Sequence, residues 1–150
     1  MSEPRARVLR IERTFAAPAE AVFEAWTSEE VLRRWLHAEP GWATPVADVD
    51  LRVGGTLRVV MRNPATGSEY GARGEYTAVE PPNRLAFTWV WDHDPSNSQL
   101  IELELSEHGG TTTVLMINSG IPTDQVRKDQ KSGWQKCNDN LDRLLAQPSS

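Results

Sequence analysis

Apolar and polar residues alternate along most of the chain, and this period of two is typical of half-buried β-strands. The first such stretch lies in "RVLRIERTFAAP", where Leu9, Ile11 and Phe15 fall on one side. Six further stretches each end at a cluster of turn-forming residues. Because short turns cannot join parallel neighbours, these strands are predicted to be mostly antiparallel. The six stretches are 44–53, 56–63, 70–80, 84–92, 99–107 and 111–120.

Three other segments carry apolar residues at steps of three and four, which predicts amphipathic helices. Two of them are short and follow the first strand: 18–26, opened by Pro18, and 27–36, capped by Thr27 or Ser28. The third is long and runs from about Pro122 to Ala146. Its apolar stripe is formed by Trp134, Cys137, Leu141, Leu144 and Leu145.

A seven-strand antiparallel sheet with one apolar face must cover that face, and only the last helix is long enough to do so. We therefore expect an α+β fold in which a curved sheet wraps around the long C-terminal helix and the two short helices close the ends. One domain spans 1–150, with a core of about 8–146 and frayed termini. Strand parity assigns the following residues to the inner face: Leu57, Val59, Met61, Tyr70, Ala72, Gly74, Tyr76, Leu85, Phe87, Trp89, Trp91, Ile101, Leu103, Leu105, Val114, Met116 and Asn118.

The strand at 70–80 carries unusually small inward residues, because only Ala72 and Gly74 lie between Tyr70 and Tyr76. Either the helix packs closely there or a space remains. A cavity at this place would have an amphipathic aromatic rim, which is common in ligand sites. The alternative is that the same rings fill the core.

Four segments resemble a known family: "FAAPAEAVFEAWTSEEVLRRWL", "ADVDLRVGGTLRVVMRNPATG", "GEYTAVEPPNRLAFTWVW" and "LMINSGIP…GWQKCNDNLDRLL". They are similar to the domain related to the C-terminal part of the activator of the heat-shock protein 90 ATPase, in the START-like (SRPBCC) superfamily. The resemblance covers about Val8 to Leu145 and implies a helix-grip fold, with a sheet gripping the last helix around a hydrophobic cavity.

For function, the resemblance implies a binder of a small ligand or lipid, of the single-domain bacterial type, with no agreed catalytic residues. The chaperone activator itself has an additional N-terminal domain that carries much of its chaperone contact, and we expect no room for such a domain in this chain. Direct activation of a chaperone is therefore disfavoured, and chaperone contact is kept only as an alternative.

Composition excludes several classes of partner. The net charge of −5 disfavours nucleic acid and anionic membranes, and no apolar run is long enough to be inserted in a bilayer. One cysteine, Cys137, excludes an internal disulfide and a cysteine-rich zinc site. The start of the chain lacks the apolar core of a secretory signal, so we expect a cytoplasmic protein. A homodimer stays open.

Candidate chemistry is sparse. In Asp92-His93-Asp94, consecutive extended residues point to opposite sides, so a strand that runs into a turn is favoured over a metal site. No histidine falls on the predicted inner face, so neither Cys137 nor a serine has an activating base. Asp50 with Arg52 is interpreted as a structural ion pair rather than a general acid. We therefore assign no catalytic residue, metal or cofactor.

The resulting hypothesis is non-enzymatic binding of a small hydrophobic or aromatic ligand, lipid-like or polyketide-like, between the sheet and the last helix. Asn118 and the tyrosine hydroxyls would orient the ligand, and Trp42 is placed near the cavity mouth or against the short helices. The alternatives are a cyclase- or aldol-type enzyme, which needs an ionisable group in the cavity, and a stress-response protein that acts with a chaperone. The predicted ligand-binding residues are Trp35, Met61, Tyr70, Tyr76, Phe87, Trp89, Val114, Met116, Asn118 and Trp134.

Overall fold

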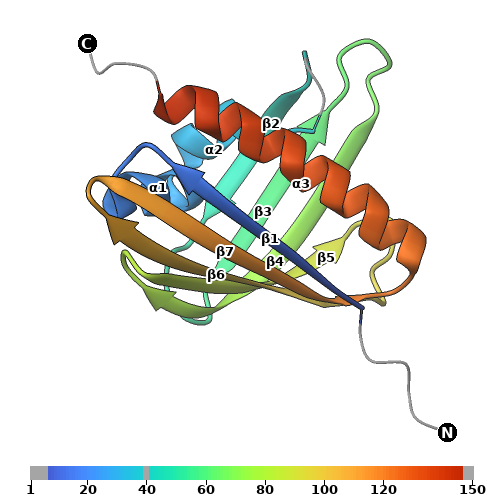
Figure 1. Ribbon diagram of the computed structural model, residues 1–150. Coiled ribbons are helices and arrows are strands. Elements are labelled where there is room, and N and C mark those ends of the chain that lie inside the picture. The colour runs from blue at the N-terminus through green and yellow to red at the C-terminus, as the bar shows by residue number, and fades with distance from the viewer. Residues whose placement is uncertain (1–6, 39–40, 147–150) are drawn as a thin grey trace, which may run out of the picture.

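A computed structural model describes residues 7–38 and 41–146 of the chain. All seven strands form one antiparallel sheet in the order β1-β7-β6-β5-β4-β3-β2, so each strand after β2 pairs with its neighbour in sequence and β1 joins β7 (Figure 1). The elements are β1 (Arg7–Phe15), α1 (Ala19–Thr27), α2 (Glu29–Trp35), β2 (Ala43–Val49), β3 (Thr56–Arg62), β4 (Glu69–Glu80), β5 (Arg84–Trp91), β6 (Gln99–His108), β7 (Thr111–Ile121) and α3 (Asp124–Leu145).

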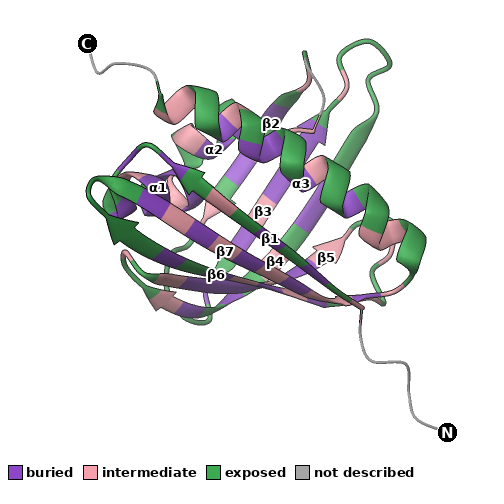
Figure 2. Ribbon diagram, viewed as in Figure 1, coloured by how far each residue is buried: buried purple, intermediate pink, exposed green. Residues whose placement is uncertain are grey.

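The last helix crosses the concave face of the sheet, and α1 and α2 lie together at one end of the same face (Figure 1). α3 packs against β1, β7, α1 and α2. The side of α3 that faces away from the sheet is largely exposed, whereas the strands behind it carry buried positions (Figure 2). The predicted α+β arrangement of a curved seven-strand sheet, a long C-terminal helix and two short helices is confirmed.

Two of the three helices, α2 and α3, begin at a residue whose side chain caps the helix. The Ser28 side chain accepts a hydrogen bond from the Val31 amide at 3.3 Å, and the Thr123 side chain accepts one from Val126 at 3.1 Å. Pro18 stands immediately before α1, where its missing amide hydrogen costs nothing. α3 therefore begins two residues later than the predicted Pro122, because Thr123 is the better cap. No helix in the described part of the chain is long and apolar enough to cross a membrane.

The inner-face assignment agrees with the burial of most strands, and Tyr70 at the start of β4 is its most exposed member. Ala72 and Tyr76 are buried as expected, whereas Tyr70 is 43% exposed and its ring stacks on Trp42. The sequence left two explanations for Gly74, close packing of the last helix or an empty space, and the structure shows a third. A Cβ at this position would overlap the Thr88 backbone oxygen of β5. The glycine therefore admits a close approach within the sheet.

The end of the concave face next to α1 and α2 is filled with aromatic side chains. Trp26 and Trp35 meet edge to face with ring centroids 4.7 Å apart, and Trp26 also contacts Phe87 and Trp134. Trp35 is fully buried, and its indole N–H donates to the Ala25 carbonyl at 2.9 Å. We call this the closed end.

The turn between β2 and β3 is held by the predicted pair of charges. Arg52 Nε donates to the Asp50 carboxylate at 3.0 Å, on the outside of the molecule. Gly54 adopts a positive φ of 86°, which favours glycine, and a Cβ on Gly55 would overlap the Asp50 carbonyl. Asp50 is thus part of a turn, as the sequence indicated, and is not in a pocket.

Candidate functional site

A pocket of about 310 Å³ lies between the sheet and α3, with β3, β4 and β5 on one side and the first half of α3 on the other. Four structural elements and two loops contribute to its wall. Apolar and aromatic side chains dominate this wall, as in most small-molecule sites. Its lining residues are Leu36, Ala38, Trp42, Met61, Tyr70, Trp89, Trp91, His93, Val126, Asp129, Gln130, Gly133, Trp134 and Cys137.

One stripe of α3 forms a whole side of the pocket. Its six lining residues follow the spacing of three and four that places side chains on one face of a helix. Gly133 lies in the middle of this stripe, where glycine costs about 1 kcal/mol of helix stability relative to alanine. A Cβ at Gly133 would meet Ala38 at an ordinary 3.8 Å, so packing does not require the glycine. Its absent side chain leaves space in the pocket wall.

The aromatic lining residues differ in depth. Trp89 and Trp134 form the inner wall, with ring centroids 5.6 Å apart and almost no exposed surface. Two stacked pairs form the outer wall: Trp42 lies on Tyr70 at 5.4 Å with an interplanar angle of 8°, and Trp91 lies on His93 at 5.8 Å. Each stacked pair joins segments that are partly open to solvent. The outer wall is thus a set of flat aromatic surfaces at the pocket mouth.

A buried network of amides supports the wall at Gln130. Gln130 Nε2 donates to Asn118 Oδ1 at 2.7 Å and to Gln99 Oε1 at 2.9 Å. Gln130 Oε1 accepts from Gln99 Nε2 at 3.0 Å and from the Trp91 indole N–H at 3.1 Å. Because these groups satisfy one another, the network fixes both the helix side chain and the Trp91 ring.

The segment Asp92-His93-Asp94 divides between the two faces of the sheet. The Asp92 carboxylate accepts two hydrogen bonds from Arg58, at 2.7 and 2.8 Å, and these bonds hold the pKa of Asp92 below its ordinary value. His93 turns to the pocket instead, and Asp94 joins the following turn through Ser96 and Asn97. The interpretation of a strand that runs into a turn agrees with this arrangement.

His93 corrects one expectation from the sequence. We expected no histidine on the inner face, yet the His93 ring lines the pocket because it lies just past the end of β5 and stacks on Trp91. Strand parity does not apply in a turn, so the sequence pattern could not place it. Within residues 7–38 and 41–146, no three His, Cys, Asp or Glu side chains form a group that could hold a metal ion.

Cys137 also lines the pocket but is not a nucleophile in this environment. Its thiol is buried, and burial raises its pKa to about 12. At neutral pH the side chain is therefore a protonated thiol that acts as a small apolar group of the wall.

The structure places the ten predicted ligand residues in three groups. Met61, Tyr70, Trp89 and Trp134 line the pocket. Asn118 does not line the pocket. Gln130, which donates a hydrogen bond to Asn118, lines it instead and is the amide side chain that a ligand could contact. The other five belong to the buried core outside this pocket: Trp35, Tyr76, Phe87, Val114 and Met116.

Several lining residues were missed as ligand contacts by sequence reasoning. Trp91 was placed on the inner face but not in the ligand set. Gln130 could have been found because it lies four residues before Trp134, and Asp129 and Gly133 because they precede Cys137 at steps of four. Trp42, expected near the cavity mouth or against the short helices, lies at the mouth.

Comparison with known proteins identifies relatives of the whole domain. The mouse (Mus musculus) "Activator of 90 kDa heat shock protein ATPase homolog 1" is 23% identical over 129 residues, which cover 85% of this chain and 33% of the relative. The chain thus spans about a third of the length of this curated relative.

Solved structures share the fold over nearly the full length. A protein from Chromobacterium violaceum is 25% identical with a TM-score of 0.86, covering 97% of this chain and 100% of that one. The AHSA1 protein from Silicibacter pomeroyi is 28% identical with a TM-score of 0.82, covering 93% and 98%. The family model described as "Activator of Hsp90 ATPase homolog 1-like protein" matches residues 16–146, and the chain belongs to this family.

Proposed function

We propose that this protein binds a small apolar or aromatic ligand in the pocket between the sheet and α3. The observation that carries the proposal is a space of about 310 Å³ whose wall is mainly aromatic and apolar. A ligand would gain about 25 cal/mol for each Å² of apolar surface removed from water. The stacked pairs at the mouth add aromatic surface that a ligand ring can contact.

The wall also has the features of a site rather than of a packing defect. Gln130 and its partners form a preorganised polar edge that can orient one end of a ligand. Gly133 keeps space open at a cost to helix stability. Both features lie on the one stripe of α3 that lines the pocket.

The proposal is tested with N-phenyl-1-naphthylamine, a neutral aromatic probe whose fluorescence rises in apolar surroundings. We expect saturable binding with one site per chain. Trp42→Ala removes half of one stacked pair and should weaken binding about tenfold, the equivalent of roughly 1.4 kcal/mol. Leu51→Ala is the matched control, because Leu51 is an exposed apolar residue outside the pocket.

Two results would contradict ligand binding in this pocket. One is the absence of saturable binding by the wild-type protein. The other is an equal affinity in wild type, Trp42→Ala and Leu51→Ala. Native mass spectrometry of the purified protein adds a second readout, since a co-purified small molecule would appear as added mass.

Contact with a chaperone is a second candidate function. The support is the name of the family and of the mouse relative, an activator of a 90-kDa heat-shock protein ATPase. The test is the ATPase rate of a purified 90-kDa heat-shock protein with and without this protein. A concentration-dependent rise in rate would support the candidate, and an unchanged rate at saturating protein would remove it.

A further inference from the structure

The charge on the pocket wall restricts the ligand that it suits. Among the lining residues that the structure describes, Asp129 is the one acidic side chain, and the lining includes no lysine or arginine. Asp129 lies on α3 beside Gln130, and Gln125 Nε2 donates to its Oδ1 at 3.0 Å. The fixed charge of the wall is therefore negative.

The other lining groups add to the same preference. Five tryptophan and tyrosine rings belong to the pocket wall: Trp42, Tyr70, Trp89, Trp91 and Trp134. The faces of such rings are negative because of the aromatic quadrupole and attract cations within about 6 Å. Several rings around one space, together with one carboxylate, suit an organic cation that sheds its water easily.

The size and composition of the wall argue against other ions. A compact inorganic cation needs several oxygen ligands, which an aromatic wall does not supply. An anion would meet Asp129 and the negative ring faces without a compensating cation in the described lining. A carbon-substituted ammonium group instead combines a positive charge with an apolar surface that the rings can cover.

On this basis, and resting on the proposed function, we propose that the preferred ligand is an organic cation. Its substituted ammonium group lies against the aromatic wall and Asp129, and its apolar body fills the rest of the pocket. The same chemistry occurs in a free amine and in the headgroup of a choline lipid. Asp129 contributes charge attraction, and the five rings contribute contact with the ammonium group.

The test compares two ligands of the same shape by isothermal titration calorimetry at pH 8, where imidazole groups are mainly neutral. Benzyltrimethylammonium carries the charge, and neopentylbenzene replaces its nitrogen with carbon. We expect the cation to bind about fivefold more tightly than the neutral isostere. Asp129→Asn should remove most of this preference and change the affinity for neopentylbenzene less than about twofold.

Asp142→Asn is the matched control, because Asp142 is an exposed acid on the same helix outside the pocket. The preference for the cation should be the same in this variant as in wild type. A general effect of the net charge would instead lower the preference equally in both variants, and this result would overturn the role of Asp129.

The remaining outcomes separate this inference from the proposed function. If neopentylbenzene binds as tightly as the cation, the inference is overturned and apolar ligand binding stands. If neither ligand binds, both fail. A further arm uses phosphatidylcholine vesicles: transfer of lipid to the protein would identify a headgroup as the source of the cation, and binding of the free salt alone would identify a soluble amine.

Discussion

The two ends of the concave face are built from the same residue types but differ in what covers them. At the closed end, α1 and α2 bury Trp26, Trp35 and Phe87 against one another. Around the pocket, which we call the open end, the rings of Trp42, Tyr70 and Trp91 are partly exposed. The difference shows that aromatic content does not distinguish a core from a site. What distinguishes them is how much of the aromatic surface the short helices α1 and α2 cover.

The largest expected effect concerns the closed end. Trp35→Ala should lower the free energy of unfolding by about 3–5 kcal/mol, because it leaves a large cavity and an unpartnered Ala25 carbonyl. Urea unfolding measures this change. Trp42→Ala at the open end is the control and should cost less than about 1.5 kcal/mol, because its ring is only half-buried. Similar costs for the two variants would remove the distinction between the ends.

A smaller loss in the free energy of unfolding is expected when Gln130, at the polar edge of the pocket, is replaced. Gln130→Ala removes the hydrogen bonds that Gln130 makes with the buried amides of Asn118 and Gln99, and should cost about 1–3 kcal/mol in urea unfolding. Gln125→Ala removes an exposed glutamine from the same helix and should change stability by less than about 0.5 kcal/mol. If Gln130→Ala were as mild as Gln125→Ala, the network would not hold the wall.

The third prediction concerns how the stability of the folded protein depends on pH through the Cys137 thiol, which lies in the pocket wall. Its pKa is 9.0 in an ordinary setting and about 12 in the folded protein. Above pH 9 the unfolded chain loses the proton while the folded chain keeps it, so stability falls as the pH rises from 9 to 12. The contribution is up to about 1.4 kcal/mol per pH unit.

Comparison with Cys137→Ala isolates this contribution from other groups that titrate at high pH. The difference in stability between the two proteins should be constant below pH 8 and should change above pH 9. A difference that stays constant up to pH 11 would mean that the thiol ionises as readily in the folded protein as in the unfolded chain.

The smallest effect is expected for Tyr76 at the closed end. Its buried hydroxyl has no hydrogen-bond partner among the described residues, and burial raises its pKa above the ordinary 10.0, with a further contribution from Asp50 and Glu29. Tyr76→Phe removes a desolvated polar group and should leave stability within about 0.5 kcal/mol of wild type or raise it. A loss above 1 kcal/mol would reveal a partner for the hydroxyl.

The sequence predicted the fold well because period and turn chemistry act locally. All seven strands, both short helices and the long helix follow from alternation, caps and turn clusters. The site was harder to predict for a physical reason. Parity says that Phe87 and Trp89 share a face, but only the position of α1 and α2 decides that Phe87 lies in the core and Trp89 at a pocket.

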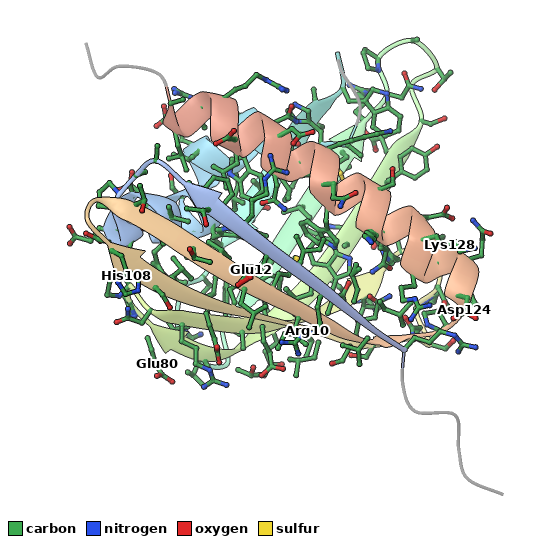
Figure 3. The ribbon with its side chains drawn as sticks, in the orientation of Figure 1. Arg10, Glu12, Glu80, His108, Asp124 and Lys128 are labelled. Carbon is green, nitrogen blue, oxygen red and sulfur yellow. The ribbon has the colours of Figure 1, made fainter. Side chains whose placement is uncertain are left out.

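For polar and charged surface residues too, the sequence pattern does not show at which end of the molecule each one lies. His108 and Glu80, at the ends of β6 and β4, lie at the opposite end of the molecule from Asp124 and Lys128 on α3 (Figure 3). Turn residues in the sequence are alike in composition, so their pattern does not show which of them stands near the pocket. The position of His93 follows from its contact with Trp91, which is a tertiary interaction.

The ion pair between Arg58 and Asp92 has a consequence for the far side of the sheet. It passes over Gly71 of β4, where a Cβ would overlap the Asp92 carboxylate and lie 2.9 Å from the Arg58 guanidinium. The ion pair thus links the end of β5 to β3 across β4, the strand between them. Trp91 and His93 lie at that same end of β5 and line the pocket on the concave side. A methyl group added at position 71, on the convex surface, would therefore loosen the aromatic rim on the reverse side without touching it.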